Sequence, residues 1–233
     1  MPARRNRPPL PPAPPRAGSY RVIYADPPWR FATWSEKGKG RSPEAWYDCL
    51  GLEEIAAIPV REWAARDCVL LIWVTDPMLE RAFHVLRAWG FTYKTVGFCW
   101  IKLRPGARGR LLSREDFFTG LGFWTRANAE LCLLATRGRP RRRASDVRRL
   151  IVSPRREHSR KPEEAYERIE RLLEGPYLEL FARSSRPGWD SWGLEAGLFA
   201  RGARPRRRWK ASGGPSRHEC DGLFPDRPAS GEE

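Results

Sequence analysis

The stretch Arg21-Val-Ile-Tyr-Ala-Asp-Pro-Pro-Trp29 carries the clearest structural information in this chain. Its apolar first half is typical of a buried β-strand. The strand is expected to end at Asp26, because a proline fixes its own φ, restricts the residue before it and has no N–H for a sheet. The sequence therefore predicts a buried strand whose carboxyl end carries an acid, a stiff turn and an aromatic ring.

The rest of the body alternates between strand-like and helix-like segments. Four more apolar runs predict strands at 69–74, 93–100, 130–136 and 177–182. The last of these runs is predicted to be the final strand of the domain. Helical spacing predicts one helix that starts at Asp76 and ends before Gly90, and another that starts at Pro162 and ends before Gly175. This alternation predicts an α/β domain with a mostly parallel sheet and helices on both faces. Ligands of such domains bind beyond the carboxyl ends of the strands.

Positive charge is concentrated in three segments. The chain has a formal net charge of +15, and residues 137–161 contain eleven cations and two acids. Residues 1–18 contain four cations, and residues 201–233 contain eight cations and five acids, which leaves a charge of −1 on the remainder. An internal basic segment of this kind favours contact with nucleic-acid phosphates. A general excess of arginine in the chain is the alternative explanation.

Length and composition limit the domain organisation. With 233 residues, of which 41% are hydrophobic, the chain can form one sizeable domain, which we place at 19–200. The segments 1–18 and 201–233 are expected to be disordered tails. Residues 103–128 lack a steady periodicity and are expected to form a mobile loop, followed by the basic segment 137–161.

Composition and missing fingerprints disfavour several classes of protein. Five cysteines without a C-x-x-C pair indicate a reducing compartment and no structural zinc. No apolar stretch approaches about 18 residues and the N-terminus has no apolar signal segment, so we expect a cytoplasmic protein without membrane contact. Missing G-x-G-x-x-G and G-x-x-x-x-G-K-[ST] fingerprints argue against nicotinamide and P-loop enzymes. Three histidines leave too few groups for a hydrolytic triad or a metal site.

The turn after the first strand suits the handling of an amino group on a flat ring. The exocyclic amine of adenine is a weak nucleophile because its lone pair is delocalised into the ring. The Asp26 carboxylate and the carbonyl of Pro27 could accept its two N–H groups and so point the lone pair at an electrophile, while Pro28 keeps the turn stiff. Trp29 would offer a face for the unstacked base. An ordinary strand end beside a core tryptophan is the alternative interpretation.

Several motifs in a shared order resemble one family: the adenine-N6 methyltransferases that use S-adenosylmethionine. It comprises the catalytic subunit of the messenger-RNA adenosine methyltransferase and its bacterial and phage relatives. The resemblance spans 20–199 and rests on the motifs Asp26-Pro-Pro-Trp29, Leu71-Ile-Trp-Val-Thr75, Trp100-Ile-Lys102, Ala129-Glu-Leu-Cys-Leu133, His158-Ser-Arg-Lys-Pro-Glu-Glu-Ala-Tyr-Glu-Arg168, Glu179-Leu-Phe-Ala-Arg183 and Gly188-Trp-Asp-Ser-Trp-Gly193. It implies a single Rossmann-like methyltransferase domain with a circularly permuted motif order, in which the half that binds the methyl donor comes last.

The resemblance also implies roles for individual residues. The catalytic residues would be Asp26, Pro27, Pro28 and Trp29, the substrate contacts Tyr47 and Glu130, and the contacts to the donor Asp26, Lys161, Arg183 and Glu195. A lysine directly before the helix at Pro162 would also favour a carboxylate through its charge and the helix dipole. The family commonly has an asparagine where this chain has Leu194, which puts one contact to the donor ribose in doubt. Ser184-Ser185-Arg186 is nearer to the bacterial branch.

The predicted activity is transfer of a methyl group from S-adenosylmethionine to the N6 amine of adenine in nucleic acid, with DNA preferred over RNA. Two alternatives stay open. One is a catalytically silent relative that binds nucleic acid or acts as a scaffold, and the other is methylation of cytosine N4 by the same chemistry. The sequence leaves open the recognition sequence, the biological role, and action as a homodimer or with another subunit.

Overall fold

The computed structural model describes residues 11–30, 49–107, 111–120, 122, 124–156 and 160–193. Within these ranges seven strands form one sheet in the order β5-β3-β4-β2-β1-β6-β7. The strands are β1 (Tyr20–Ala25), β2 (Ala64–Val74), β3 (Thr92–Leu103), β4 (Ala129–Arg137), β5 (Leu150–Pro154), β6 (Tyr177–Leu180) and β7 (Trp189–Trp192). Strand β4 runs antiparallel to its neighbours β2 and β3, and all other neighbouring pairs are parallel. The prediction of a mixed α/β domain with a mostly parallel sheet is therefore confirmed.

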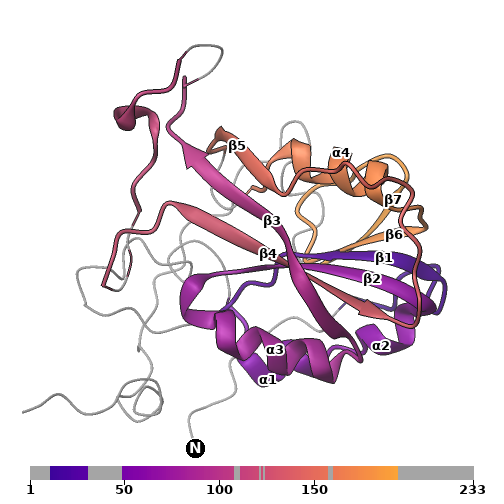
Figure 1. Cartoon of the computed structure of the whole chain (residues 1–233). Coiled ribbons are helices and arrows are strands. Elements are labelled where there is room, and N and C mark those ends of the chain that lie inside the picture. Colours follow the sequence, from indigo (N-terminus) through magenta and orange to yellow (C-terminus); the bar gives the residue numbers. More distant parts are fainter. Residues whose placement is uncertain are drawn as a thin grey trace, which may run out of the picture.

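Helices lie on both faces of this sheet (Figure 1). One face is covered by α1 (Leu52–Ala56), α2 (Val60–Trp63) and α3 (Leu79–Ala88), and the 3-10 turn η3 (Asp76–Met78) leads into α3. The other face is covered by α4 (Glu163–Leu172). A second 3-10 turn, η4 (Arg114–Asp116), lies in the long connection between β3 and β4.

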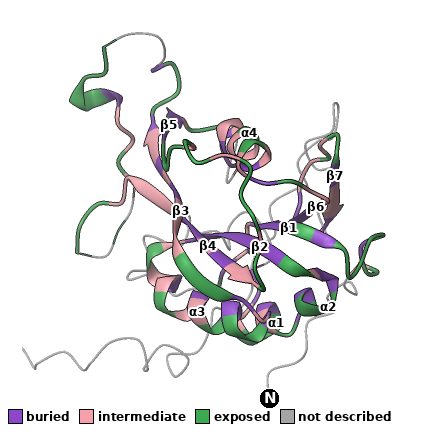
Figure 2. Cartoon of the chain, turned by 45° about the vertical axis from the view of Figure 1, so that its right-hand side comes forward, coloured by how far each residue is buried: buried purple, intermediate pink, exposed green. Residues whose placement is uncertain are grey.

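Alternation along the strands builds two apolar cores, one on each face. In β1 the side chains of Ile23 and Ala25 pack with α1–α3, whereas Val22 and Tyr24 pack with α4. The same period of two in β2, β3 and β4 fills both cores with buried aliphatic and aromatic side chains. Figure 2 shows the strands as the most buried part of the molecule and the outer helix faces as exposed.

One prediction about the chain after residue 137 is wrong, and one strand was not predicted. The run 177–182 is not the final strand, because β7 follows it and extends the sheet beyond β6. Its short sequence Trp189-Asp-Ser-Trp192 has polar residues in the middle, which conceal a strand that buries a tryptophan at each end. The basic segment 137–161 also contains β5, whose five residues are hidden among flanking arginines.

Residues 11–18 belong to the segment expected to be a disordered tail, and the structure places them against β7. The Arg16 guanidinium pairs with the Asp190 carboxylate at 2.9 Å, and the Tyr20 hydroxyl donates to the same carboxylate at 2.7 Å. The indole N–H of Trp192 donates to the carbonyl of Pro12 at 3.0 Å. These contacts attach residues 11–18 to the outermost strand of the sheet.

The strand directions give the sheet two distinct edges. The carboxyl ends of β1, β2, β3, β5, β6 and β7 meet the beginning of β4 at one edge, which we call the carboxyl edge. Asp26 and Glu130 therefore meet at this edge, although one follows a strand and the other begins one. Arg137, at the end of β4, lies at the opposite edge, which we call the amino edge.

Candidate active site

The turn after β1 is held by hydrogen bonds on both sides. The Trp29 backbone N–H donates to the carbonyl of Pro27 at 2.8 Å, and the Leu50 N–H donates to the carbonyl of Pro28 at 2.8 Å. The Trp29 indole N–H donates to the carbonyl of Trp73 in β2 at 2.9 Å. Only 3% of Trp29 is exposed, so its ring anchors the turn to the core. Its role as a stacking surface stays a prediction.

Four charged side chains form a cluster of alternating sign at the carboxyl edge. We call Asp26, Lys161, Glu130 and Lys102 the charge cluster. The Lys161 Nζ lies 2.7 Å from Asp26 Oδ1 and 3.1 Å from Glu130 Oε1, and the Lys102 Nζ lies 2.8 Å from Glu130 Oε2. Each side chain of the cluster is less than a quarter exposed, and that of Lys161 is 4% exposed.

Strand alternation explains why these side chains gather on the α4 face. Positions 22 and 24 of β1 face α4, and position 26 continues that row. Phe98 and Trp100 precede position 102 in the same way, and Cys132 follows position 130. Lys161 comes from the other direction, because it lies two residues before the start of α4. The charge cluster therefore lies where rows of apolar core side chains on this face of the sheet come to an end.

Burial and ion pairing shift the pKa of Glu130 in opposite directions. Burial would raise the pKa of this carboxyl, but the positive charges of Lys161 and Lys102 outweigh burial and lower its pKa to about 2. Glu130 is therefore ionised at neutral pH. A buried carboxylate of this kind depends on its cations, since an unpaired charge in the interior is strongly destabilising.

An aromatic floor lies under the charge cluster. The Lys161 ammonium is 5.5 Å from the centroid of the Trp73 ring, a distance at which the cation is attracted by the ring face. The Trp73 indole N–H donates to the Tyr24 hydroxyl at 2.6 Å, and Trp73 meets Trp100 edge to face at 6.4 Å between centroids. Trp73 is fully buried and belongs to the core beneath the charge cluster.

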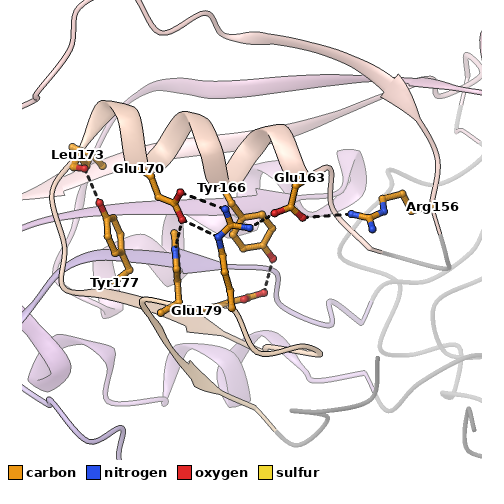
Figure 3. Close-up of polar contacts among 9 residues, drawn as sticks. Arg156, Glu163, Tyr166, Glu170, Leu173, Tyr177 and Glu179 are labelled. Atoms are coloured by element: carbon orange, nitrogen blue, oxygen red, sulfur yellow. Dashed lines mark hydrogen bonds and ion pairs between the residues drawn. The ribbon is translucent and has the colours of Figure 1, made fainter. Parts of the chain in front are cut away.

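A second polar network joins α4 to β6 and the residues after it (Figure 3). The Tyr166 hydroxyl donates to the Glu179 carboxylate at 2.8 Å. Arg186 pairs with Glu170 at 2.8 Å and also with Glu163, and its guanidinium lies 5.0 Å from the Tyr166 ring centroid. This network fixes α4, and hence Lys161 before it, relative to the strand that lies next to β1.

Glu179 is a buried acid near Asp26. It is 8% exposed, and burial raises its pKa to about 7, with a further contribution from the negative charge of Asp26. The hydrogen bond from Tyr166 and the positive charges of Arg186 and Arg183 act in the opposite direction. The Glu179 carboxyl therefore changes its protonation state near neutral pH, beside the acid of the turn.

The predicted site residues fall into two groups. Asp26, Pro27, Pro28, Trp29, Glu130, Lys161 and Arg183 all lie at or beside the carboxyl edge. Arg183 follows β6, and its charge acts on Glu179. Tyr47 and Glu195 lie outside the described residues, as does Leu194.

Sequence reasoning missed the contributions of Lys102 and Glu179. Both belong to the motifs quoted for the family resemblance, but neither was given a role. Each lies two positions along a strand from a residue that packs against the core, and this spacing could have indicated which face of the sheet it lies on. Phe181, directly after β6, is a further feature that the sequence did not indicate: its φ of 62° lies in the left-handed region, which is uncommon for a residue other than glycine. Backbone of this kind is frequent at functional sites.

The side chains at the carboxyl edge fit S-adenosylmethionine. A zwitterionic donor needs a cation for its carboxylate and acids for its amino and sulfonium groups, and Lys161 beside Asp26 and Glu130 provides both. The Thr75 hydroxyl, just after β2, is buried without a hydrogen-bond partner among the described residues, as expected where a ligand completes a site. The donor is therefore compatible with these residues.

No group of three or more potential metal ligands occurs in the described ranges. None of their helices is long and apolar enough to cross a membrane.

The chain is similar to several known methyltransferases. The MT-A70 family model matches residues 20–195. The chain is 32% identical to Type II methyltransferase M.MunI of Mycoplasma sp over 76% of this chain and 77% of that protein. It is 30% identical to the N(6)-adenosine-methyltransferase MT-A70-like protein of Arabidopsis thaliana, over 84% of this chain and 26% of that protein. It is also 30% identical to the human N(6)-adenosine-methyltransferase catalytic subunit METTL3, over 76% of this chain and 28% of that protein.

The matched segment contains the strands and α4 that build the charge cluster, and it runs from the start of β1 to three residues beyond β7. A family model that covers most of the chain, together with a bacterial relative aligned over about three quarters of both proteins, identifies the fold and the chemistry together. The chain belongs to the MT-A70 family of S-adenosylmethionine-dependent adenine-N6 methyltransferases.

Proposed function

We propose that this protein methylates the N6 amine of adenine in DNA. The observation that carries the proposal is the placement of Asp26 in a hydrogen-bonded turn, 2.7 Å from a buried lysine that can hold the donor. The similarity to a type II methyltransferase over most of its length supports DNA over RNA as the substrate. We also propose the domain limits 19–200, a Rossmann-like fold with a circularly permuted motif order, and action in the cytoplasm.

Two acceptors would hold the amine. Asp26 offers a carboxylate that is 19% exposed at the end of β1. The Pro27 carbonyl already accepts the Trp29 N–H, and its second lone pair is available for the other N–H of the amine. Both acceptors belong to a stiff backbone, so they need little reorganisation when the base arrives. In this arrangement the nitrogen lone pair is directed away from the ring plane.

The bound donor supplies an electrophilic methyl group on a sulfonium. Lys161 would bind the donor carboxylate, and Arg183 would bind its ribose, with Glu195 in the segment outside the described residues. The amine held by Asp26 and the Pro27 carbonyl would accept this methyl group as the carbon–sulfur bond of the donor breaks, and the excess proton on the nitrogen would leave to water. Alignment of the two reactants contributes most of the rate enhancement expected from such a site.

Lys161 has a second task in this arrangement. It pairs with Asp26 and Glu130 at the same time, so a donor carboxylate at Lys161 would compete with them for its N–H groups. Binding of the donor would thereby loosen the Lys161–Asp26 pair and free Asp26 oxygens for the amine. We propose that the donor binds before the base for this reason.

The test is incubation of the purified protein with labelled S-adenosylmethionine and separate pools of double-stranded DNA, single-stranded DNA and RNA. Mass spectrometry of the digested nucleosides should find N6-methyladenine in DNA, and sequencing of the modified sites should identify the target context. N4-methylcytosine as the product would overturn the choice of base. Donor binding without any methylated nucleoside would instead identify a silent relative.

A further inference from the structure

The first part of the basic segment, residues 137–149, leaves β4 at the amino edge, and only the end of the segment returns to the site. Six of its arginines are exposed, and we call them the arginine track: Arg139, Arg141, Arg142, Arg143, Arg148 and Arg149. The chain leaves β4 at the amino edge and passes over the outside of α4 before it enters β5 (Figure 1), and Figure 2 shows most of this segment as exposed. Glu130 and Arg137 are at opposite ends of β4, so about 24 Å separates the site from the start of the track.

The six side chains of the arginine track are not paired with acids in the described part of the chain. No carboxylate among the described residues forms an ion pair with any of its six side chains. The only acid between 137 and 149 is Asp146, which pairs with Arg171 of α4. Repulsion among uncompensated like charges disfavours such a surface in the free protein. A polyanion would remove that cost.

The backbone that carries the track is nevertheless well fixed. The Arg139 N–H donates to the Asp67 carboxylate at 2.7 Å, and the Arg143 N–H donates to the Leu172 carbonyl at the end of α4 at 2.7 Å. Val147 packs against the core on the α4 face. The six guanidinium groups, none of which is paired with a described acid, are therefore carried by an anchored backbone. Less conformational entropy is lost when they bind phosphates than if the backbone were free.

We propose that the arginine track binds the phosphate backbone of the DNA duplex at a distance from the methylated adenine. This proposal rests on the proposed function, which supplies the DNA partner. Successive base pairs rise by about 3.4 Å, so the distance along β4 corresponds to about seven base pairs. Arginine is suited to this task because its fork pairs with phosphate oxygens through two hydrogen bonds.

The basic surface also continues towards the site. Strand β5 leads from Arg149 to Arg155 and Arg156 at the carboxyl edge. The Arg155 guanidinium lies 3.8 Å from the Phe118 ring centroid, and Arg156 pairs with Glu163 at 3.6 Å. A duplex that reaches the site could follow this surface over the outside of α4 to the track.

The experiment measures how binding of a random-sequence 30-base-pair duplex depends on salt, by fluorescence anisotropy. The variant R141Q/R142Q removes two charges from the track, R141K/R142K keeps them, and R81Q/R87Q removes two from α3 on the opposite face of the sheet. Each phosphate contact contributes about 0.9 to the slope of log K against log salt. R141Q/R142Q should flatten the slope by about two, whereas the other two variants should match the wild type.

A second experiment measures KM for two substrates, each with the target sequence at its centre. A hairpin duplex with four base pairs on either side of the adenine extends about 14 Å to each side, which is less than the distance of about 24 Å to the start of the track. R141Q/R142Q should raise KM several-fold for the 30-base-pair substrate and leave the short hairpin unchanged. The proposal fails if R141Q/R142Q and R81Q/R87Q have the same salt slope, or if R141Q/R142Q loses binding only to vesicles containing phosphatidylserine. Failure of the proposed function would appear separately, as normal salt slopes without any methylation.

Discussion

The two edges of one sheet use charge in opposite ways. At the carboxyl edge, cations and acids of the charge cluster alternate at 2.7 to 3.1 Å and are largely buried. At the amino edge and over α4, the arginines of the track are exposed and have no described acid as a partner. Paired, buried charges fix the position of a small group, whereas unpaired, exposed charges attract a polymer over a distance set by the salt concentration. The difference lies in the surroundings, since both regions are built from ordinary Asp, Glu, Lys and Arg residues.

The largest effect on activity is expected from Asp26→Ala, because this substitution removes a hydrogen-bond acceptor from the charge cluster at the carboxyl edge. Methylation should fall by at least about 100-fold, as for the loss of one preorganised group that stabilises the transition state. Single-turnover rates with saturating donor measure this. Asp26→Asn retains an acceptor oxygen and should lose less. Turnover by Asp26→Ala within tenfold of the wild type would contradict the assignment.

Lys161→Met should have the next largest effect, since it leaves two acids close together without their shared cation. Breaking a buried pair in this way typically costs about 3 kcal/mol of unfolding free energy. Affinity for the donor should also fall by about 30-fold or more, through loss of the partner for its carboxylate. Urea unfolding and calorimetric titration with S-adenosylmethionine measure the two effects.

Acid titration of the same variant sharpens the test. The pKa of Glu130 is lowered to about 2, below its ordinary value of 4.5, so its contribution to stability is present above about pH 4.5 and is lost as the pH falls towards 2. Lys161→Met should lack much of this acid-dependent loss, because its folded state no longer lowers the pKa as strongly. Identical acid unfolding of the variant and the wild type would show that Lys161 does not stabilise the carboxylate.

Glu179→Gln should have a moderate effect with the opposite dependence on pH. The pKa of Glu179 is raised from 4.5 to about 7 by burial, so the folded state binds the proton more tightly than the unfolded state. Its stabilising contribution is complete below about pH 4.5 and falls as the pH rises to 7, by up to about 3 kcal/mol. The difference in unfolding free energy between wild type and variant, measured from pH 4 to pH 8, should follow this trend. A difference that does not vary with pH would contradict it.

The smallest effect on stability is expected from R141Q/R142Q. These side chains are exposed and have no described ion-pair partner, so the unfolding free energy should stay within about 0.5 kcal/mol of the wild type. Thermal unfolding at low and high salt provides the measurement. A loss comparable to that of Lys161→Met would mean that the two edges do not differ in the way described above.

Local sequence pattern was sufficient to predict most of the elements. Period-two and helical spacing predicted the strands β1 to β4 and β6, and the helices α3 and α4, because these patterns depend only on which residues of a segment face the core. It failed for β5, which is short and flanked by arginines, and for β7, which is short and has two polar residues in its middle. The helices α1 and α2, of five and four residues, were also too short to produce a clear pattern.

The acid, the two prolines and the tryptophan of the turn indicated both the strand end and the chemistry by themselves, because stiffness and hydrogen-bonding capacity are properties of the residues alone. The pairing of Lys161 with Asp26 and Glu130 was not available from the sequence, since it depends on strand order and on the reversed direction of β4. The same reversal carries the arginines away from the site. Burial of Trp29 and the raised pKa of Glu179 likewise follow from neighbours that are distant in the chain, and such neighbours are known only once the sheet is assembled.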